Sequence, residues 1–176
     1  MEMNETVLKS LRTRRSVRAY LPKQVEADAL EAVLTAGTYA PTGMNRQAPV
    51  IVAVQNAEVI AKMSALNAAV MGSDKDPFYG APTVLVVLAD PEVRTWVEDG
   101  SLVMGNLMNA AHAVGLASCW IHRAREVFDT AEGKALLKEW GLPERLRGVG
   151  NCILGSAADP LPEARPRKDG YVVHVK

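Results

Sequence analysis

Short apolar runs alternate with longer amphipathic segments along the chain. Four of the runs have the length and composition of buried strands. They are VIVAV at 50–54, TVLVVLA at 83–89, ASCWI at 117–121 and GVGNCILG at 148–155. The tail is rich in proline and then ends in the alternating run YVVHV, which predicts one further strand.

Between these strands, apolar residues recur at the spacing of amphipathic helices. Helices are predicted at about 4–11, 26–38, 57–70, 92–114 and 129–140. Asp90-Pro91 is expected to start the longest one, with Asp as the N-cap and Pro in the first turn. Asp129 followed by Glu132 resembles a capping box for the last helix. The longest helix is apolar on more than one side, which favours a central position or a subunit interface.

The alternation of strands and helices, without a repeat or a linker, predicts one α/β or α+β domain over residues 1–176. Lys plus Arg and Asp plus Glu both number 20. This neutral balance argues against a nucleic-acid-binding protein, which would need a basic excess. The polar, acidic N-terminus and the lack of a long apolar run predict a cytoplasmic protein with neither a signal peptide nor a membrane partner.

The usual motifs of catalysis are missing from the sequence. It contains no GxGxxG, GxxxxGK[ST] or GxSxG pattern, and its histidines and cysteines have no metal-ligand spacing. Cys119 and Cys152 are interpreted as buried thiols in a reducing compartment. We therefore predict no catalytic side chain and no metal, and we expect any chemistry to come from an organic cofactor.

A run of arginines near the N-terminus, RTRRSVR at 12–18, is the strongest candidate for an anion site. If the run is extended, Arg14, Ser16 and Arg18 point the same way, while Arg12 and Arg15 face elsewhere. Two guanidinium groups and a hydroxyl group on one side suit a phosphate. The alternative interpretation is a solvated charge run.

Two further segments carry candidate binding groups. The tail holds a second basic cluster, Arg165, Arg167 and Lys168. The loop PTGMNRQ at 41–47 offers amide side chains, which can satisfy the donor and acceptor edges of a heteroaromatic ring. Turn chemistry alone also explains its Pro, Gly and Asn residues.

Five segments in this order resemble the FMN-dependent nitroreductase family, above all its small single-domain NAD(P)H nitroreductase branch. They are RRSVRAY, APTGMNRQAP, NLMNAAHAVGLASCWIHRAREVF, GVGNCILG and PRKDGY. The resemblance implies an α+β fold with a central, mostly antiparallel sheet flanked by helices. It also implies an intertwined homodimer whose C-terminal strand joins the sheet of the partner, with FMN bound between the subunits.

The resemblance implies a set of cofactor-binding residues, which the two chains would share. These are Arg14, Arg15, Ser16 and Arg18 near the phosphate, ribityl chain and ring edge; Pro41, Thr42, Gly43, Asn45 and Gln47 from the other subunit; Cys119, Trp120, Ile121 and His122 near N5, largely through the backbone; and Arg167 and Lys168 over the phosphate. Phe78 and Tyr79 are candidates for the substrate pocket, in a segment at 71–80 that would either cover the site or pack against the protein.

The implied activity is the transfer of hydride from NADH or NADPH to a nitroaromatic, a quinone or a similar small-molecule acceptor, by a ping-pong mechanism. Two alternatives stay open on the sequence. One is a non-catalytic protein that binds or stores FMN. The other is a specialised flavin reductase or a dehalogenase-like enzyme.

Overall fold

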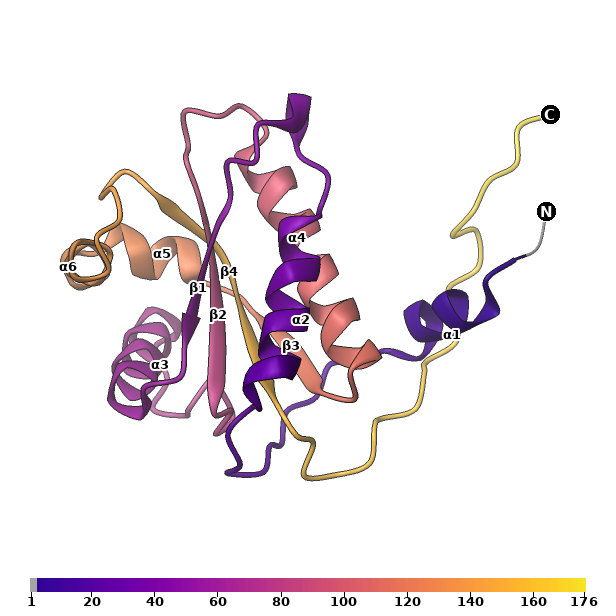
Figure 1. Cartoon of the computed structure of the whole chain (residues 1–176), viewed down its shortest axis with the longest axis horizontal. Helices are drawn as coiled ribbons and strands as arrows, with labels where there is room; N and C mark the ends of the chain where they lie inside the picture. The colour runs from indigo at the N-terminus through magenta and orange to yellow at the C-terminus, as the bar shows by residue number, and fades with distance from the viewer. Residues whose placement is uncertain (1–2) are drawn as a thin grey trace.

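Four strands form one antiparallel sheet at the centre of the protein (Figure 1). The computed structural model describes residues 3–176, so residues 1–2 of the predicted domain lie outside the described range. The strands are β1 (Val50–Val54), β2 (Thr83–Ala89), β3 (Ala117–Ile121) and β4 (Arg147–Gly155). Their order across the sheet is β1-β2-β4-β3, and every pair is antiparallel. All four predicted core strands are confirmed, and the fold is α+β.

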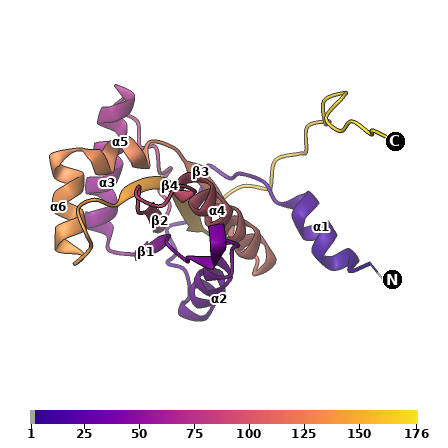
Figure 2. The same ribbon diagram turned by 90° about the horizontal axis from the view of Figure 1, so that it is seen from above.

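Helices cover both faces of this sheet (Figure 2). One face packs against α3 (Ala57–Met71), α5 (Ala124–Asp129) and α6 (Ala131–Glu139). The other face packs against α2 (Ala27–Thr38) and α4 (Trp96–Ala113). All residues of β2 are buried, because this central strand is covered on both faces. Its continuous apolar run therefore predicts its place correctly.

The two chain ends lie away from this body, on the same side of it (Figures 1 and 2). Helix α1 (Glu5–Thr13) is capped by Asn4, whose side chain accepts a hydrogen bond from the N–H of Val7 at 3.2 Å. It buries none of its residues within the chain, and its apolar side chains Val7, Leu8 and Leu11 are all exposed. Residues 158–176 are exposed along their whole length.

Two predicted helix starts are wrong. Helix α4 begins at Trp96, several residues after Asp90-Pro91. The Asp90 carboxylate caps a separate turn, where it accepts a hydrogen bond from the N–H of Glu92 at 3.0 Å. The helix predicted at 129–140 starts after Thr130, whose hydroxyl oxygen accepts a hydrogen bond from the N–H of Gly133 at 3.0 Å.

The segment before Thr130 forms the separate helix α5, so this region holds two short helices at a corner. The corner explains Gly133, because a Cβ atom there would collide with the backbone of Val127. The tail forms no strand within residues 156–176. Its predicted pairing with the sheet of a partner subunit stays a prediction.

Candidate functional site

The arginine run lies along the open edge of β3. Ser16 and Ser118 form an isolated parallel bridge, and the N–H of Val17 donates to the carbonyl oxygen of Ser118 at 3.1 Å. Val17 is buried, while Arg18 is exposed and Ser16 is half-buried. The run is therefore extended here, as the predicted alternation of side chains requires.

Arg14 carries a donor that the protein leaves without an acceptor. Its Nη1 atom is buried and has no hydrogen-bond partner among residues 3–176. Buried donors are almost always satisfied, so such an atom fits an anionic ligand. Arg15 differs, because its Nη1 donates to the carbonyl oxygens of Arg12 and Arg14 at 2.8 and 2.7 Å. Its Nε is also buried and lacks a partner within the described chain.

Strand β3 adds two more buried polar atoms on the side that faces α4. They are Ser118 Oγ and Trp120 Nε1, and neither has a hydrogen-bond partner in the described part of the chain. The indole ring lies over Gly150, where a Cβ atom would approach Nε1 to 2.7 Å. Sequence reasoning missed Ser118, although it lies two positions before Trp120 and so shares its face of the strand.

The two neighbouring predicted residues of β3 point away from these atoms. Cys119 and Ile121 are buried in the core on the other face, so they can reach a ligand on the α4 side only through the backbone. Cys152 on β4 is fully buried as well, and its burial, followed by the nearby Cys119, raises its pKa to about 12. Its thiol is therefore protonated at neutral pH, which argues against Cys152 as a nucleophile.

His122 follows β3 and is exposed, while its carbonyl oxygen is held from the core side. That oxygen accepts a hydrogen bond from Nδ2 of Asn67 at 2.9 Å. Asn67 on α3 is fully buried, and its Oδ1 has no partner within residues 3–176. The next residue, Arg123, has a φ of 72° and is the N-cap of α5. Nothing in the sequence around Asn67 distinguishes it from a surface amide.

The loop at 41–47 lies at the N-terminal end of α4. The N–H of Gly43 donates to Oδ1 of Asp99 at 2.9 Å, and the hydroxyl of Thr95 donates to Oδ2 at 3.0 Å. Asp99 is only 2% exposed. A Cβ atom on Gly43 would collide with Oγ1 of Thr95, so the close approach requires glycine.

The same loop holds three residues in left-handed backbone conformations. Met44, Asn45 and Gln47 have φ values of 54°, 53° and 50°. The N–H of Gln47 donates to Thr42 Oγ1 at 3.0 Å, and its Nε2 donates to Asn45 Oδ1 at 3.2 Å. Conformations of this kind persist where the surroundings enforce them, and they concentrate at binding sites. Pro41 is exposed at the start of the loop.

We expect Asp99→Ala to release this loop. The substitution leaves the Gly43 N–H and the Thr95 hydroxyl without their acceptor, at a cost of about 1–3 kcal/mol for a buried group. Amide hydrogen exchange at Gly43 should become faster by at least tenfold. In Asp99→Asn, which keeps one acceptor oxygen, exchange should stay closer to the wild-type rate. Unchanged exchange in Asp99→Ala would show that Asp99 does not hold the loop.

Arg167 and Lys168 are exposed in the tail and do not contact the arginine run. The polar contact of Arg167 is within the tail, from Nη2 to the carbonyl oxygen of Arg165 at 2.7 Å. The tail begins beside the arginine run, however. The N–H of Leu21 donates to Ser156 O, and the N–H of Ala158 donates to Ala19 O, both at 3.0 Å.

The structure buries Phe78 in the core beneath α3, at 1% exposure, and leaves Tyr79 42% exposed. The side chain of Phe78 therefore does not line a surface pocket in this chain. Its segment is held by Asp76, which accepts from Ser64 Oγ at 2.6 Å, from Phe78 N at 2.8 Å and from Gly80 N at 2.7 Å. The segment packs against the protein in this chain, and its role over a substrate pocket stays a prediction.

A cavity of about 670 Å³ lies along α3 and the segment that precedes β2. It shares no residue with the predicted flavin set. Within residues 3–176, no cluster of three or more His, Cys, Asp or Glu side chains is arranged to hold a metal ion. Across the same residues, no helix has both the length and the apolar character needed to cross a membrane.

Comparison with known proteins identifies the family. The sequence model described as "Nitroreductase family" matches residues 11–77 and 69–155. The chain belongs to the nitroreductase family. The predicted resemblance is thereby confirmed, and so is the predicted nitroreductase-like fold.

Relatives and solved structures agree with this assignment. The nitroreductase-family chain is 32% identical over 161 residues to a protein of Archaeoglobus fulgidus, covering 88% of this chain and 87% of that protein. The name of that protein gives NADH dehydrogenase/NAD(P)H nitroreductase as its provisional activity. The crystal structure of a Bacteroides fragilis nitroreductase with bound FMN superposes with a TM-score of 0.90 at 33% identity, covering 99% of this chain and 100% of that one.

A second FMN-bound nitroreductase structure, from Desulfitobacterium hafniense, has a TM-score of 0.86 at 29% identity, with 99% and 100% of the two chains covered. The chain is also 27% identical over 174 residues to the FMN reductase [NAD(P)H] of Bacillus subtilis. That match covers 89% of this chain and 68% of the Bacillus protein.

Proposed function

We propose that this protein is an FMN-dependent oxidoreductase that passes hydride from NADH or NADPH to a nitroaromatic, a quinone or a similar acceptor. One observation carries the proposal. Buried polar atoms of Arg14, Ser118 and Trp120 have no hydrogen-bond partner within residues 3–176 and lie on or beside one edge strand, within a fold whose solved relatives bind FMN. A phosphate-bearing cofactor with a polar ring edge would satisfy such atoms.

Different residues would bind different parts of the cofactor. Arg14, Ser16 and Arg18 would bind the phosphate, the ribityl chain and the ring edge, and Arg18 would add positive charge beside the ring. Backbone groups of β3 beyond Ser118, whose carbonyl oxygen already accepts from the N–H of Val17, would lie along the ring. Arg167 and Lys168 would close over the phosphate. When bound, FMN supplies the hydride-transfer chemistry, by a ping-pong sequence.

The position of the loop at 41–47 supports a site shared between two chains. Asp99 fixes this loop at the N-terminal end of α4, while Thr13, within the arginine run, contacts His112 at 2.9 Å at the C-terminal end. From Thr95 to His112 the helix rises about 26 Å, at 1.5 Å per residue. This separation along α4 supports a site shared between two chains, in which a second copy would supply either the loop or the arginine run.

Exposed apolar surfaces support the same homodimer. Helix α1 leaves Val7 at 52% and Leu11 at 51% exposure, beside a cavity of about 450 Å³ against α4. The tail exposes Tyr171, Val172, Val173 and Val175. Apolar groups on segments that extend from the body indicate a protein interface. We propose that a partner chain covers them and that the tail joins its sheet. A cytoplasmic location stays a prediction.

The proposal is tested with the full-length protein. An absorbance spectrum and mass analysis should show one FMN per chain, and light scattering at micromolar concentration should show a dimer. Anaerobic NADH or NADPH should bleach the bound flavin, and a quinone or a nitroaromatic should restore its colour. Protein that stays colourless after reconstitution with FMN would overturn the proposal. Protein that binds FMN but is not bleached by either nucleotide would favour a storage role.

We expect His122→Ala and Cys119→Ser to keep the reductase activity within about tenfold of the wild type, or about 1.4 kcal/mol of barrier. Neither side chain has the partners of an acid, a base or a nucleophile, since Cys119 is buried in the core and His122 is exposed. Steady-state kinetics with FMN content measured on the same samples provides the test. A loss of several orders of magnitude with FMN fully bound would assign the chemistry to a side chain and favour a specialised reaction.

A further inference from the structure

A small cavity lies between the loop at 41–47 and the turn that precedes α4. Its volume is about 220 Å³, and it is lined by Gly43, Met44, Arg46, Val93, Arg94 and Thr95. Ligand pockets for whole cofactors are usually about 300–1,000 Å³. This cavity therefore suits one substituent of a larger ligand. Through Gly43 it adjoins the residues that the proposed function places at the flavin.

The charged side chains that line this cavity are both positive. Arg46 and Arg94 are exposed, and neither forms an ion pair with a carboxylate within residues 3–176. The polar contact of Arg46 is a weak one, from Nη2 to the sulfur of Met44 at 3.8 Å. Glu92 and Glu98 belong to the same segment as Arg94 but do not pair with it.

The nearest buried carboxylate, that of Asp99, already has hydrogen-bond partners. Both oxygens of Asp99 accept hydrogen bonds, from the Gly43 N–H and from the Thr95 hydroxyl, so this group holds the cavity wall. Arg46 follows Asn45 and precedes Gln47, two residues held in left-handed conformations. The wall that carries Arg46 is thus fixed, which reduces the entropy lost when a ligand binds. The adjacent N-terminus of α4, an 18-residue helix, adds positive potential, which Glu98 and Asp99 in its first turn partly offset.

We propose that this cavity binds a phosphate group of the nicotinamide dinucleotide reductant, with Arg46 and Arg94 as its two cationic ligands. Guanidinium groups match phosphate oxygens in charge and in geometry. The inference rests on the proposed function, because it needs the reductant to approach the flavin beside the loop at 41–47. Two phosphates of the reductant have the required chemistry: the 2′-phosphate, which only NADPH carries, and the pyrophosphate, which NADH and NADPH share.

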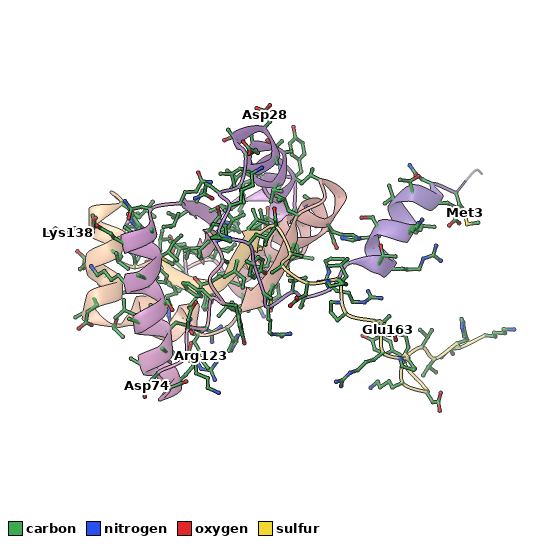
Figure 3. All side chains as sticks on the ribbon, turned by 90° about the horizontal axis from the view of Figure 1, so that it is seen from below. Met3, Asp28, Asp74, Arg123, Lys138 and Glu163 are labelled. Atoms are coloured by element: carbon green, nitrogen blue, oxygen red, sulfur yellow. The ribbon has the colours of Figure 1, made fainter. Side chains whose placement is uncertain are left out.

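The test uses the FMN-loaded, full-length protein and the variants Arg46→Ala and Arg94→Ala. Lys138→Ala is the matched control, because it also removes one exposed positive charge but lies on α6, across the sheet from α4 (Figure 3). Titration calorimetry with 2′,5′-ADP and with AMP measures binding without turnover. Each arginine variant should bind 2′,5′-ADP about tenfold more weakly, the effect of one charge-assisted hydrogen bond. KM for NADPH should rise by a similar factor, with kcat little changed.

The pattern of change identifies the phosphate. A rise in KM for NADPH alone, with AMP binding unchanged, assigns the cavity to the 2′-phosphate. A rise for both NADH and NADPH, with weaker AMP binding, assigns it to the pyrophosphate end. If both arginine variants behave like Lys138→Ala, the proposal is wrong. FMN content and bleaching of the wild-type flavin by NADPH separate this result from failure of the proposed function, in which the wild type would hold no flavin or would not be bleached.

Discussion

Arg14→Ala should bind FMN ten- to a hundredfold more weakly than the wild type. In the protein alone, Nη1 of Arg14 is buried with no acceptor among the described residues, so a bound phosphate would provide its first hydrogen bond. A charge-assisted bond of this kind contributes about 1.5–3 kcal/mol. The dissociation constant is measured by fluorescence titration of the FMN-free protein, which is prepared identically for each variant.

Arg12→Ala is the matched control for this measurement. Arg12 lies two positions before Arg14, but its side chain is 68% exposed and pairs on the surface with Glu5 at 3.1 Å. Exposed ion pairs contribute little, so its FMN affinity should stay within about twofold of the wild type. The backbone carbonyl of Arg12 that accepts from Arg15 is kept in the variant. Equal FMN affinities for the Arg12 and Arg14 variants would exclude Arg14 as a phosphate ligand.

Phe78→Ala should destabilise the protein by about 3–5 kcal/mol, the usual cost of removing a buried aromatic side chain. Phe78 is 1% exposed and packs in the same core cluster as Met63 and Val84. Removal of the ring leaves a cavity in this core. Because the ring does not reach the surface, KM for the acceptor in the folded fraction should not change. Urea denaturation followed by circular dichroism gives the free energy of unfolding, and steady-state kinetics gives KM.

Two further variants keep this prediction testable. Phe78→Leu retains most of the buried volume, so it should fold even if Phe78→Ala does not, and it should cost less stability. Tyr79→Ala alters the neighbouring aromatic residue, which is 42% exposed, and its stability should change by no more than about 0.5 kcal/mol. A Phe78→Leu protein with wild-type stability but a changed KM for the acceptor would show that Phe78 belongs to the substrate pocket.

Much of the fold could be predicted from the sequence because the signals are local. The apolar run of β2 marks a strand covered on both faces, since the strand has no position at which a polar side chain would reach water. The spacing of Arg14, Ser16 and Arg18 places them on one side only if the segment is extended, and the bridge between Ser16 and Ser118 shows that it is extended there. The start of α4, in contrast, was predicted wrongly from Asp90, because an aspartate caps a turn as readily as a helix.

The candidate site is different, since contacts between distant residues decide it. Asp99 shares the apolar stripe of α4 with Val103 and Leu107, and a carboxylate at such a position was a signal that could have been noticed. Its partner Gly43, however, is on another element, and only the folded chain shows that the carboxylate is satisfied by an N–H group of the loop.

Phe78 and Tyr79 are adjacent aromatic residues in one polar loop, and the sequence treats them alike. The fold separates them, because Asp76 turns the segment so that one ring enters the core and the other stays at the surface. The sequence by itself thus determined the strands, the longest helices and the arginine run, each of which depends on periodicity within a few residues. Which polar atoms are buried, and which of them lack a partner, depends on packing between elements far apart in the chain, and only the tertiary structure decided it.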